Sequence, residues 1–99
     1  MTTKTPSLTI DADRHEVFVG KREVKLAPRE YLILKMLKDS GKTISREHFL
    51  SALWPGKDHD LTDSRTIDQH ISRLRRKIKA PYIATVSNFG YRWDGDKLS

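Results

Sequence analysis

The sequence predicts a single α+β domain made of short N-terminal strands, three helices and a C-terminal β-hairpin. Residues 7–26 alternate apolar and polar positions between turn residues, which is typical of antiparallel strands. Three segments between residues 28 and 79 carry apolar residues at helical spacing, and residues 82–93 return to two β-prone runs around a turn. A chain of 99 residues can form one modest core. We therefore expect one domain at 7–94, between tails at 1–6 and 95–99.

The composition indicates the cellular compartment of the protein and the class of its binding partner. The chain has no cysteine, so no disulfide framework is possible, and no apolar run reaches the roughly 18 residues of a membrane span. Residues 1–6 lack the apolar core of a signal peptide. A net charge of +6 and a pI near 9.8 favour an anionic partner. We expect a cytoplasmic protein that binds nucleic acid. A membrane surface is the rival, disfavoured because the basic third helix lacks a Trp or Phe anchor.

The N-terminal strands are predicted from alternation and turns. Leu8 and Ile10 alternate with polar residues, and residues 11–13 favour a turn. Residues 16–19 are β-prone, and the bend at Gly20 leads into a third run at 23–26. Such short strands are not stable alone, so we expect a helix to cover one face of the sheet.

The first helix is predicted over residues 28–40. Pro28 suits the first helical position, Glu30 favours the positive end of the helix dipole, and Gly41 suits a left-handed stop. An apolar stripe runs along it: Tyr31, Ile33, Leu34 and Leu37. Leu32 and Met36 add a second apolar patch, which indicates a central helix that is buried all round. The alternative for these two residues is a partner-binding patch.

A short strand at 42–44 and a second helix follow. Ser45 is a good N-cap, and Glu47 lies in the first turn. The apolar residues of this helix are Phe49, Leu50, Leu53 and Trp54. Pro55 and Gly56 end it, and a polar loop over residues 57–64 leads to the third helix, with a cap at residue 63 or 64. Two helices joined in this way form a helix-turn-helix with a long turn.

The third helix, residues 65–79, has one apolar and one cationic face. The apolar stripe is Ile67, Ile71, Leu74 and Ile78. The opposite face carries Arg65, Gln69, Ser72, Arg73 and Arg76. Six cationic residues against Asp68 alone give the segment a net charge of +5, nearly the whole excess of the chain. Arginine side chains can pair with guanine and glutamine side chains with adenine, so we interpret the helix at 65–79 as a recognition helix. The alternative is a solvated amphipathic helix.

A terminal hairpin completes the predicted fold. Residues 82–86 and 91–93 are β-prone, and residues 87–89 form the turn, with Asn88 or Gly90 at positive φ. A hairpin next to a recognition helix is a wing.

Several segments, in this order, carry a resemblance that spans almost the whole chain. They are Leu26-Ala-Pro-Arg-Glu30-Tyr-Leu-Ile-Leu34, Ile44-Ser-Arg-Glu-His-Phe-Leu50, Leu53-Trp54, Arg65-Thr-Ile-Asp-Gln-His-Ile71, Arg73-Leu-Arg-Arg-Lys77, Thr85-Val86 and Gly90-Tyr91-Arg92. Their order and spacing resemble the DNA-binding effector domain of OmpR/PhoB-type response regulators of two-component systems. The resemblance implies a winged helix-turn-helix: a four-stranded N-terminal sheet, three helices and a hairpin wing. The third helix would enter the major groove and the wing would approach the minor groove.

The resemblance also assigns roles to particular residues. Positions that face bases are Asp68, Gln69, Ser72 and Arg73. Positions that contact phosphates are Trp54, Arg65, Thr66 and Tyr91; Arg75 and Arg76 join them because Arg75 lies on the flank of the helix and Arg76 on its outer face. Trp54 is equally suited to the core. Two copies would bind tandem half-sites as a dimer on DNA. Lys57 and Asp60 lie in the loop that could face RNA polymerase, or that only sets the helix angle.

The chain departs from the family pattern at two places. In the usual architecture of the family a phosphorylatable receiver domain precedes this one, and these 99 residues hold none, so we expect either an excised effector domain or a regulator that works without a receiver. Ala27 stands where the family has Thr, so half of the capping box is lost, which should cost about 1 kcal/mol. The wing usually carries Arg-Gly-x-Gly-Tyr, whereas residues 87–91 begin with Ser87 and Asn88 and lack a cationic tip. We therefore expect the wing to contribute less to DNA affinity than it does in the family, with Ser87 or Asn88 at most touching a phosphate.

An enzyme is not expected. The four histidines lack metal-ligand spacing and the chain has no Gly-rich phosphate loop, so we assign no catalytic residue, no metal and no cofactor. His70, between the two faces of the third helix, is expected to be packed or hydrogen-bonded. The remaining alternative function is a winged-helix module for protein–protein interaction without specific DNA readout.

Overall fold

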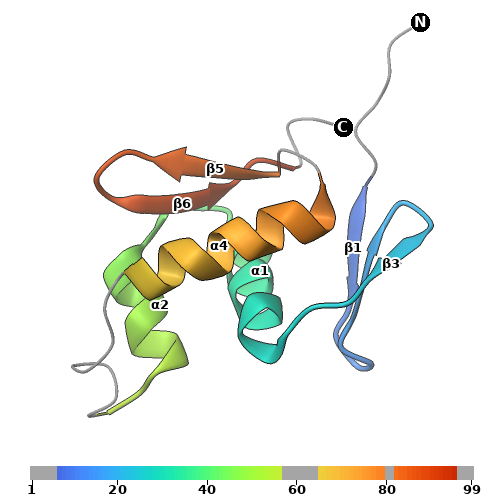
Figure 1. Ribbon diagram of the computed structural model, residues 1–99, viewed down its shortest axis with the longest axis horizontal. Helices are drawn as coiled ribbons and strands as arrows, with labels where there is room; N and C mark the ends of the chain where they lie inside the picture. Colours follow the sequence, from blue (N-terminus) through green and yellow to red (C-terminus); the bar gives the residue numbers. More distant parts are fainter. Residues whose placement is uncertain (1–6, 57–64, 80–81, 96–99) are drawn as a thin grey trace, which may run out of the picture.

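The computed structural model describes residues 7–56, 65–79 and 82–95, which form two small sheets and three helices (Figure 1). The elements are β1 (Leu8–Asp11), β2 (Glu16–Val19), β3 (Arg22–Val24), α1 (Pro28–Ser40), β4 (Ile44–Ser45), α2 (Arg46–Leu53), α4 (Arg65–Ile78), β5 (Ile83–Val86) and β6 (Gly90–Trp93). Helix α1 lies between the N-terminal sheet and α2, and α4 crosses in front of it (Figure 1). The predicted α+β class and its three helices are confirmed for the described residues.

The N-terminal sheet is antiparallel with the order β1-β2-β3. Val17 pairs with Ile10 on one side and Val24 on the other, so one apolar row faces the core. The four strands predicted for this sheet were wrong: its described part has three. The chain turns toward α1 directly after Val24, and the next strand, β4, pairs with β6 instead, because it follows α1 and lies at the other end of the domain.

Helix α1 has the predicted ends. Pro28 is its first residue, and Gly41 follows it with a φ of 66°, the left-handed conformation that glycine adopts without strain. The predicted stripe is buried, but the helix is not buried all round. Leu32 is 44% exposed, and Met36 is only partly buried against the core. The expectation of a core position was therefore wrong for Leu32, because no described element covers this side of α1.

Helices α2 and α4 pack with α1 around one core. The Oγ atom of Ser45 accepts a hydrogen bond from the backbone N–H of His48 at 3.1 Å, which confirms it as the N-cap of α2. The apolar stripe of α4 is fully buried: Ile67, Ile71, Leu74 and Ile78 are each 0% exposed. Each such side chain stabilises the fold by about 1.5–3 kcal/mol. This burial fixes which face of α4 points outward.

The C-terminal sheet has the order β4-β6-β5. The hairpin turn places Asn88 at a φ of 61°, so Asn88 and not Gly90 supplies the left-handed residue. Gly90 is required for another reason: a Cβ there would lie 1.9 Å from the carbonyl oxygen of Ile44 in β4. The close approach of β4 to β6 attaches the wing to the start of α2. None of the described helices is long and apolar enough to cross a membrane.

Candidate nucleic-acid interface

The outer face of α4 presents a row of polar and cationic side chains. Arg65, Gln69, Ser72, Arg73 and Arg76 are all exposed, as predicted from the helical wheel. The 14 residues of the helix span about 21 Å, enough to lie along a major groove. Because the opposite stripe is completely buried, the helix cannot rotate without unfolding its core. The helix positions that carry these guanidinium and amide side chains are therefore fixed on one surface.

Asp68 differs from these neighbours because its carboxylate is already occupied. Its Oδ1 accepts hydrogen bonds from Arg46 Nε at 2.8 Å and from the Tyr91 hydroxyl at 2.5 Å. Arg46 is the first residue of α2 and Tyr91 lies in β6. The side chain expected to face bases thus connects three elements in the free protein, and its own side chain is 40% exposed.

Tyr91 lies at the centre of this connection. It is 4% exposed, and the guanidinium groups of Arg46 and Arg75 lie 5.2 Å and 5.4 Å from its ring centroid. Burial raises the pKa of Tyr91, and the hydrogen bond to Asp68 raises it further, so the phenol stays protonated as a donor. We call Arg46, Asp68, Arg75 and Tyr91 the clasp.

Arg75 extends the clasp into the wing. Its Nη2 donates to the carbonyl oxygen of Ile83 at 2.9 Å and to Oγ1 of Thr85 at 2.7 Å. Both acceptors belong to β5. The flank position predicted for Arg75 is therefore used to join α4 to the hairpin, and the clasp sets the angle between α4 and the wing.

The C-terminus of α4 is fixed from the N-terminal sheet. Arg22, the first residue of β3, donates to the carbonyl oxygens of Lys77 at 3.4 Å and Ile78 at 3.3 Å. A cation at this end complements the helix dipole and satisfies carbonyls that have no partner within the helix. Lys79 ends the helix with a φ of 55°, and its N–H donates to the Arg75 carbonyl at 3.0 Å.

A buried acid holds α4 against the start of α1. Glu30 is 2% exposed, and its Oε1 accepts from Lys77 Nζ at 2.6 Å and from the Ala27 N–H at 3.0 Å. The latter bond is the half of the capping box that Ala27 leaves intact, because its methyl group cannot accept the reciprocal bond. Burial by itself would raise the pKa of Glu30, but the hydrogen bonds from Lys77 and Ala27 outweigh it and the pKa falls below the usual 4.5.

This shift has a direct consequence for acid stability. A carboxyl group whose pKa is depressed by folding stabilises the folded state above its unfolded-state pKa. The contribution of Glu30 is therefore fully present above about pH 4.5 and is lost as the pH falls through the lower folded-state value. No sequence pattern indicated this ion pair, since residues 30 and 77 lie far apart along the chain.

Trp54 is half-buried at the end of α2. Its ring contacts His70 edge-on at 5.8 Å between centroids, and the Arg29 guanidinium lies 4.4 Å from its centroid. His70 Nδ1 donates to the carbonyl oxygen of Thr66 at 2.7 Å, which confirms the packed, hydrogen-bonded role expected for this histidine. Sequence reasoning missed Arg29, which lies beside the residue expected to contact a phosphate.

The wing turn is exposed and carries no cation. Ser87 and Asn88 are exposed, and Phe89 is 52% exposed. Arg92 pairs with Asp94 at 2.8 Å and so is neutralised. Lys57 and Asp60 lie outside the described residues, as do the predicted caps of α4 and both predicted tails except Gly95. Within the described ranges no group of acids and histidines could hold a metal ion.

Comparisons with known proteins show the family of the chain. A family model described as "Transcriptional regulatory protein, C terminal" matches residues 21–93. The chain is 35% identical over 94 residues to the virulence transcriptional regulatory protein PhoP of Salmonella typhimurium, covering 90% of this chain and 41% of PhoP. It is 37% identical over 95 residues to the transcriptional regulatory protein BaeR of Escherichia coli, covering 90% of this chain and 39% of BaeR. The chain thus spans about two fifths of these relatives.

Solved structures extend the likeness to protein–DNA complexes. The Klebsiella pneumoniae RstA DNA-binding domain, in complex with the RstA box, superposes with a TM-score of 0.77 at 32% identity, covering 95% of this chain and 97% of that one. The DNA-binding domain of the response regulator AdeR, in complex with an intercistronic region, gives 0.78 at 27% identity, with 95% and 98% covered. DrrB, a Thermotoga maritima OmpR/PhoB homologue, gives 0.78 at 31% identity, with 89% and 42% covered.

Proposed function

Because the chain belongs to the family of C-terminal domains of transcriptional regulatory proteins, we propose that it binds double-stranded DNA sequence-specifically, as the effector domain of a bacterial response regulator. In this proposal α4 enters the major groove and the wing lies near the minor groove. The observation that carries it is the outer face of α4, where a fixed row of arginine, glutamine and serine side chains lies opposite a fully buried stripe.

The base-reading residues of this proposal are Gln69, Ser72 and Arg73. All three are exposed on the outer face of α4, with side chains whose donors and acceptors match base edges in the major groove. Asp68 was expected to join them. Since its Oδ1 atom accepts hydrogen bonds from Arg46 and Tyr91, we assign Asp68 first to positioning the helix against the wing.

The phosphate-binding residues surround this row. Arg65 and Arg76 are exposed cations, and Thr66 lies half-buried beside them in the first turn of α4. Trp54, with Arg29 over its ring, suits a phosphate that approaches the junction of α2 and α4. Arg75 and Tyr91 were also expected to contact phosphates. In this proposal they act mainly within the clasp, where their hydrogen bonds hold α4 against the wing.

The assembly on DNA is part of the proposal. Two copies would occupy tandem half-sites as a dimer, and the loop with Lys57 and Asp60 would contact RNA polymerase. A regulator of transcription acts at the chromosome, so we place it in the cytoplasm. Alanine at both loop positions should lower transcription without changing DNA affinity; unchanged transcription would remove the loop from the proposal.

A mobility-shift titration at several salt concentrations tests the proposed function. Affinity should fall steeply with salt, with a log–log slope of about −0.9 per neutralised phosphate. Arg73→Ala should weaken binding to the preferred site by about 1–3 kcal/mol and relax its sequence preference. Arg65→Ala, the matched loss of one guanidinium, should weaken all sequences alike and reduce the slope.

The same titration distinguishes the proposed function from the alternative of a winged-helix module that binds only protein. That module would show weak DNA binding without sequence preference, and Arg73→Ala and Arg65→Ala would then have the same small effect.

A further inference from the structure

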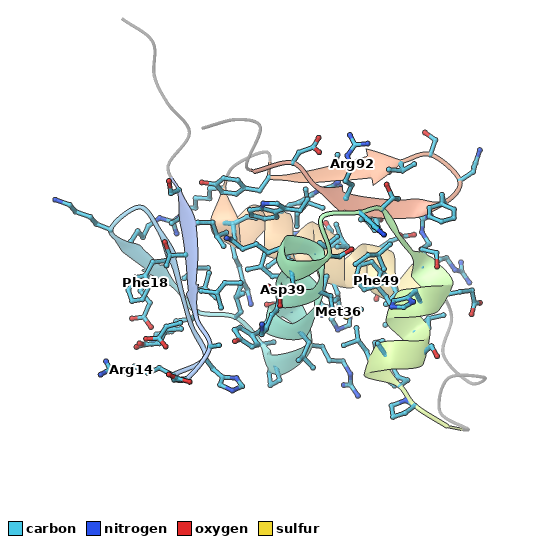
Figure 2. All side chains as sticks on the ribbon, turned by 180° about the vertical axis from the view of Figure 1, so that it is seen from behind. Arg14, Phe18, Met36, Asp39, Phe49 and Arg92 are labelled. Carbon is cyan, nitrogen blue, oxygen red and sulfur yellow. The ribbon has the colours of Figure 1, made fainter. Side chains whose placement is uncertain are left out.

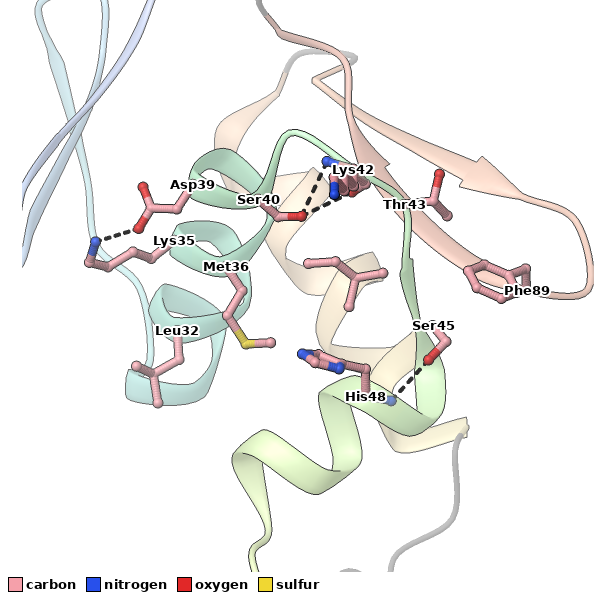
Figure 3. Close-up of a pocket in the computed structure, with 11 residues that line it drawn as sticks. Leu32, Lys35, Met36, Asp39, Ser40, Lys42, Thr43, Ser45, His48 and Phe89 are labelled. Carbon is pink, nitrogen blue, oxygen red and sulfur yellow. Dashed lines mark hydrogen bonds and ion pairs between the residues drawn. The ribbon is translucent and has the colours of Figure 1, made fainter.

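A second surface lies on the side of the domain away from α4. It is a groove of about 730 Å³ between α1, β4, the start of α2 and the wing turn (Figure 3). Leu32 and Phe89 lie at its two ends, and Met36 points across it toward His48 (Figure 3). Leu32 and Phe89 are the only large apolar side chains that are strongly exposed within the described parts of the chain. Both belong to this groove.

The groove stays open when α4 is occupied. Viewed from the front, α4 covers α1, and viewed from behind, α1 and the groove residues lie in front of α4 (Figures 1 and 2). A ligand on the outer face of α4 therefore approaches from the opposite side. A partner over Leu32 and Met36 would be compatible with the proposed binding to DNA, whereas Phe89 lies in the wing turn, which that proposal places near the minor groove.

Lys42 gives the groove one positive charge that no described acid pairs with. Lys35 is neutralised by Asp39, whose carboxylate lies 2.6 Å from its ammonium group. Lys42 and His48 are exposed, and neither side chain has an ion pair among the described residues. The groove also borders the first turn of α2, where the helix dipole adds partial positive charge. An acidic partner is therefore complementary to this side of the groove.

The shape favours a helix as the occupant. Leu32 and Met36 lie four residues apart on α1 and form an exposed ridge, the type of row into which a second helix packs. An extended strand is less suitable because β4, the strand beside the groove, has only two residues with which to pair. From this geometry we propose that the groove binds an amphipathic, acidic α-helix of a partner protein. Its apolar face lies on Leu32, Met36 and Phe89, and its acids face Lys42 and His48.

Titration of the ¹⁵N-labelled chain with three synthetic peptides tests the proposal. One is an 18-residue peptide with leucines at positions i, i+3, i+4 and i+7 and flanking glutamates; the second has lysine for every glutamate; the third has the first composition in scrambled order. The acidic amphipathic peptide should move the amide resonances of residues 32–48 and of Phe89. Leu32→Ser and Lys42→Glu should each weaken binding by about tenfold.

Two matched variants serve as controls. Phe18→Ser removes an aromatic side chain from the outer face of the N-terminal sheet, and Lys21→Glu makes the same charge change at an exposed position outside the groove. Both should bind the acidic peptide like the parent chain. Lys42→Glu should also improve binding of the lysine peptide.

Failure of the groove proposal can be distinguished from failure of the proposed DNA binding. Leu32→Ser should leave DNA affinity and its salt slope unchanged. The proposal is overturned if no peptide binds, if the scrambled or lysine peptide binds equally well, or if the controls weaken binding as much as the groove variants. It is also overturned if the groove resonances shift with protein concentration alone, since a second copy would then be the occupant.

Discussion

The hydrogen bond between Tyr91 and Asp68 gives a test of the clasp. Tyr91→Phe removes one hydroxyl group and keeps the ring beside Arg46 and Arg75. A hydrogen bond to a charged group contributes about 1.5–3 kcal/mol when buried. The Tyr91 side chain is buried, but Asp68 is 40% exposed and water can replace part of the bond, so we expect a loss of about 1 kcal/mol. For a chain of this length that loss lowers Tm by about 4–8 °C.

A double-mutant cycle isolates this bond from other effects. Urea unfolding is measured for Tyr91→Phe, Asp68→Asn and the double variant. The two single losses should not add, and the coupling free energy should be about 1 kcal/mol. A parallel cycle combines Asp68→Asn with Tyr31→Phe, which changes a buried tyrosine stacked on His15 in another part of the domain. The two losses in this control cycle should add within about 0.5 kcal/mol. Additive losses for Tyr91 and Asp68 would mean that the clasp does not hold the wing.

The start of α1 and the wing each lead to further predictions. Lys77→Met should lower the free energy of unfolding by about 1–3 kcal/mol at neutral pH, because the buried Glu30 carboxylate loses its cation. Adding Glu30→Gln to this variant should restore part of the loss in urea unfolding. Below the folded-state pKa of Glu30 the single variant should match the parent chain, and a penalty that persists there would refute the ion-pair account. Ala27→Ser should raise stability by about 1 kcal/mol, because residue 27 already has the extended backbone of an N-cap; no gain in thermal unfolding would show that the cap is not limiting. Alanine at Ser87 or Asn88 should weaken DNA binding by less than about 1 kcal/mol in a salt-controlled titration, whereas abolished binding would make the wing a main contact.

Local features of the fold were predictable because each depends on neighbouring residues. The apolar stripe of α4 follows from helical spacing alone, and its four residues are fully buried. Gly41 and Ser45 mark a helix end and a helix start for reasons of backbone conformation and hydrogen bonding. The outer face of α4 was therefore identified residue by residue from the sequence.

Features that depend on distant pairing were not predictable in the same way. The two residues of β4 pair with β6 across more than forty positions, so the residues around the predicted short strand could not indicate the sheet to which it belongs. Asp68 was placed correctly on α4, but its partners come from α2 and β6, and periodicity within one helix cannot indicate them. Leu32 was assigned to the core because apolar periodicity does not reveal whether a neighbouring element exists to cover it.

The most direct test of the central claim is selection of bound sites from a random DNA pool, with the parent chain and with Arg73→Ala. The account predicts an enriched motif with a repeated half-site for the parent chain. It also predicts that Arg73→Ala loses preference at one position of each half-site and keeps the rest. A pool without any enriched motif, or an unchanged motif for Arg73→Ala, would contradict the assignment of α4 as the helix that reads DNA.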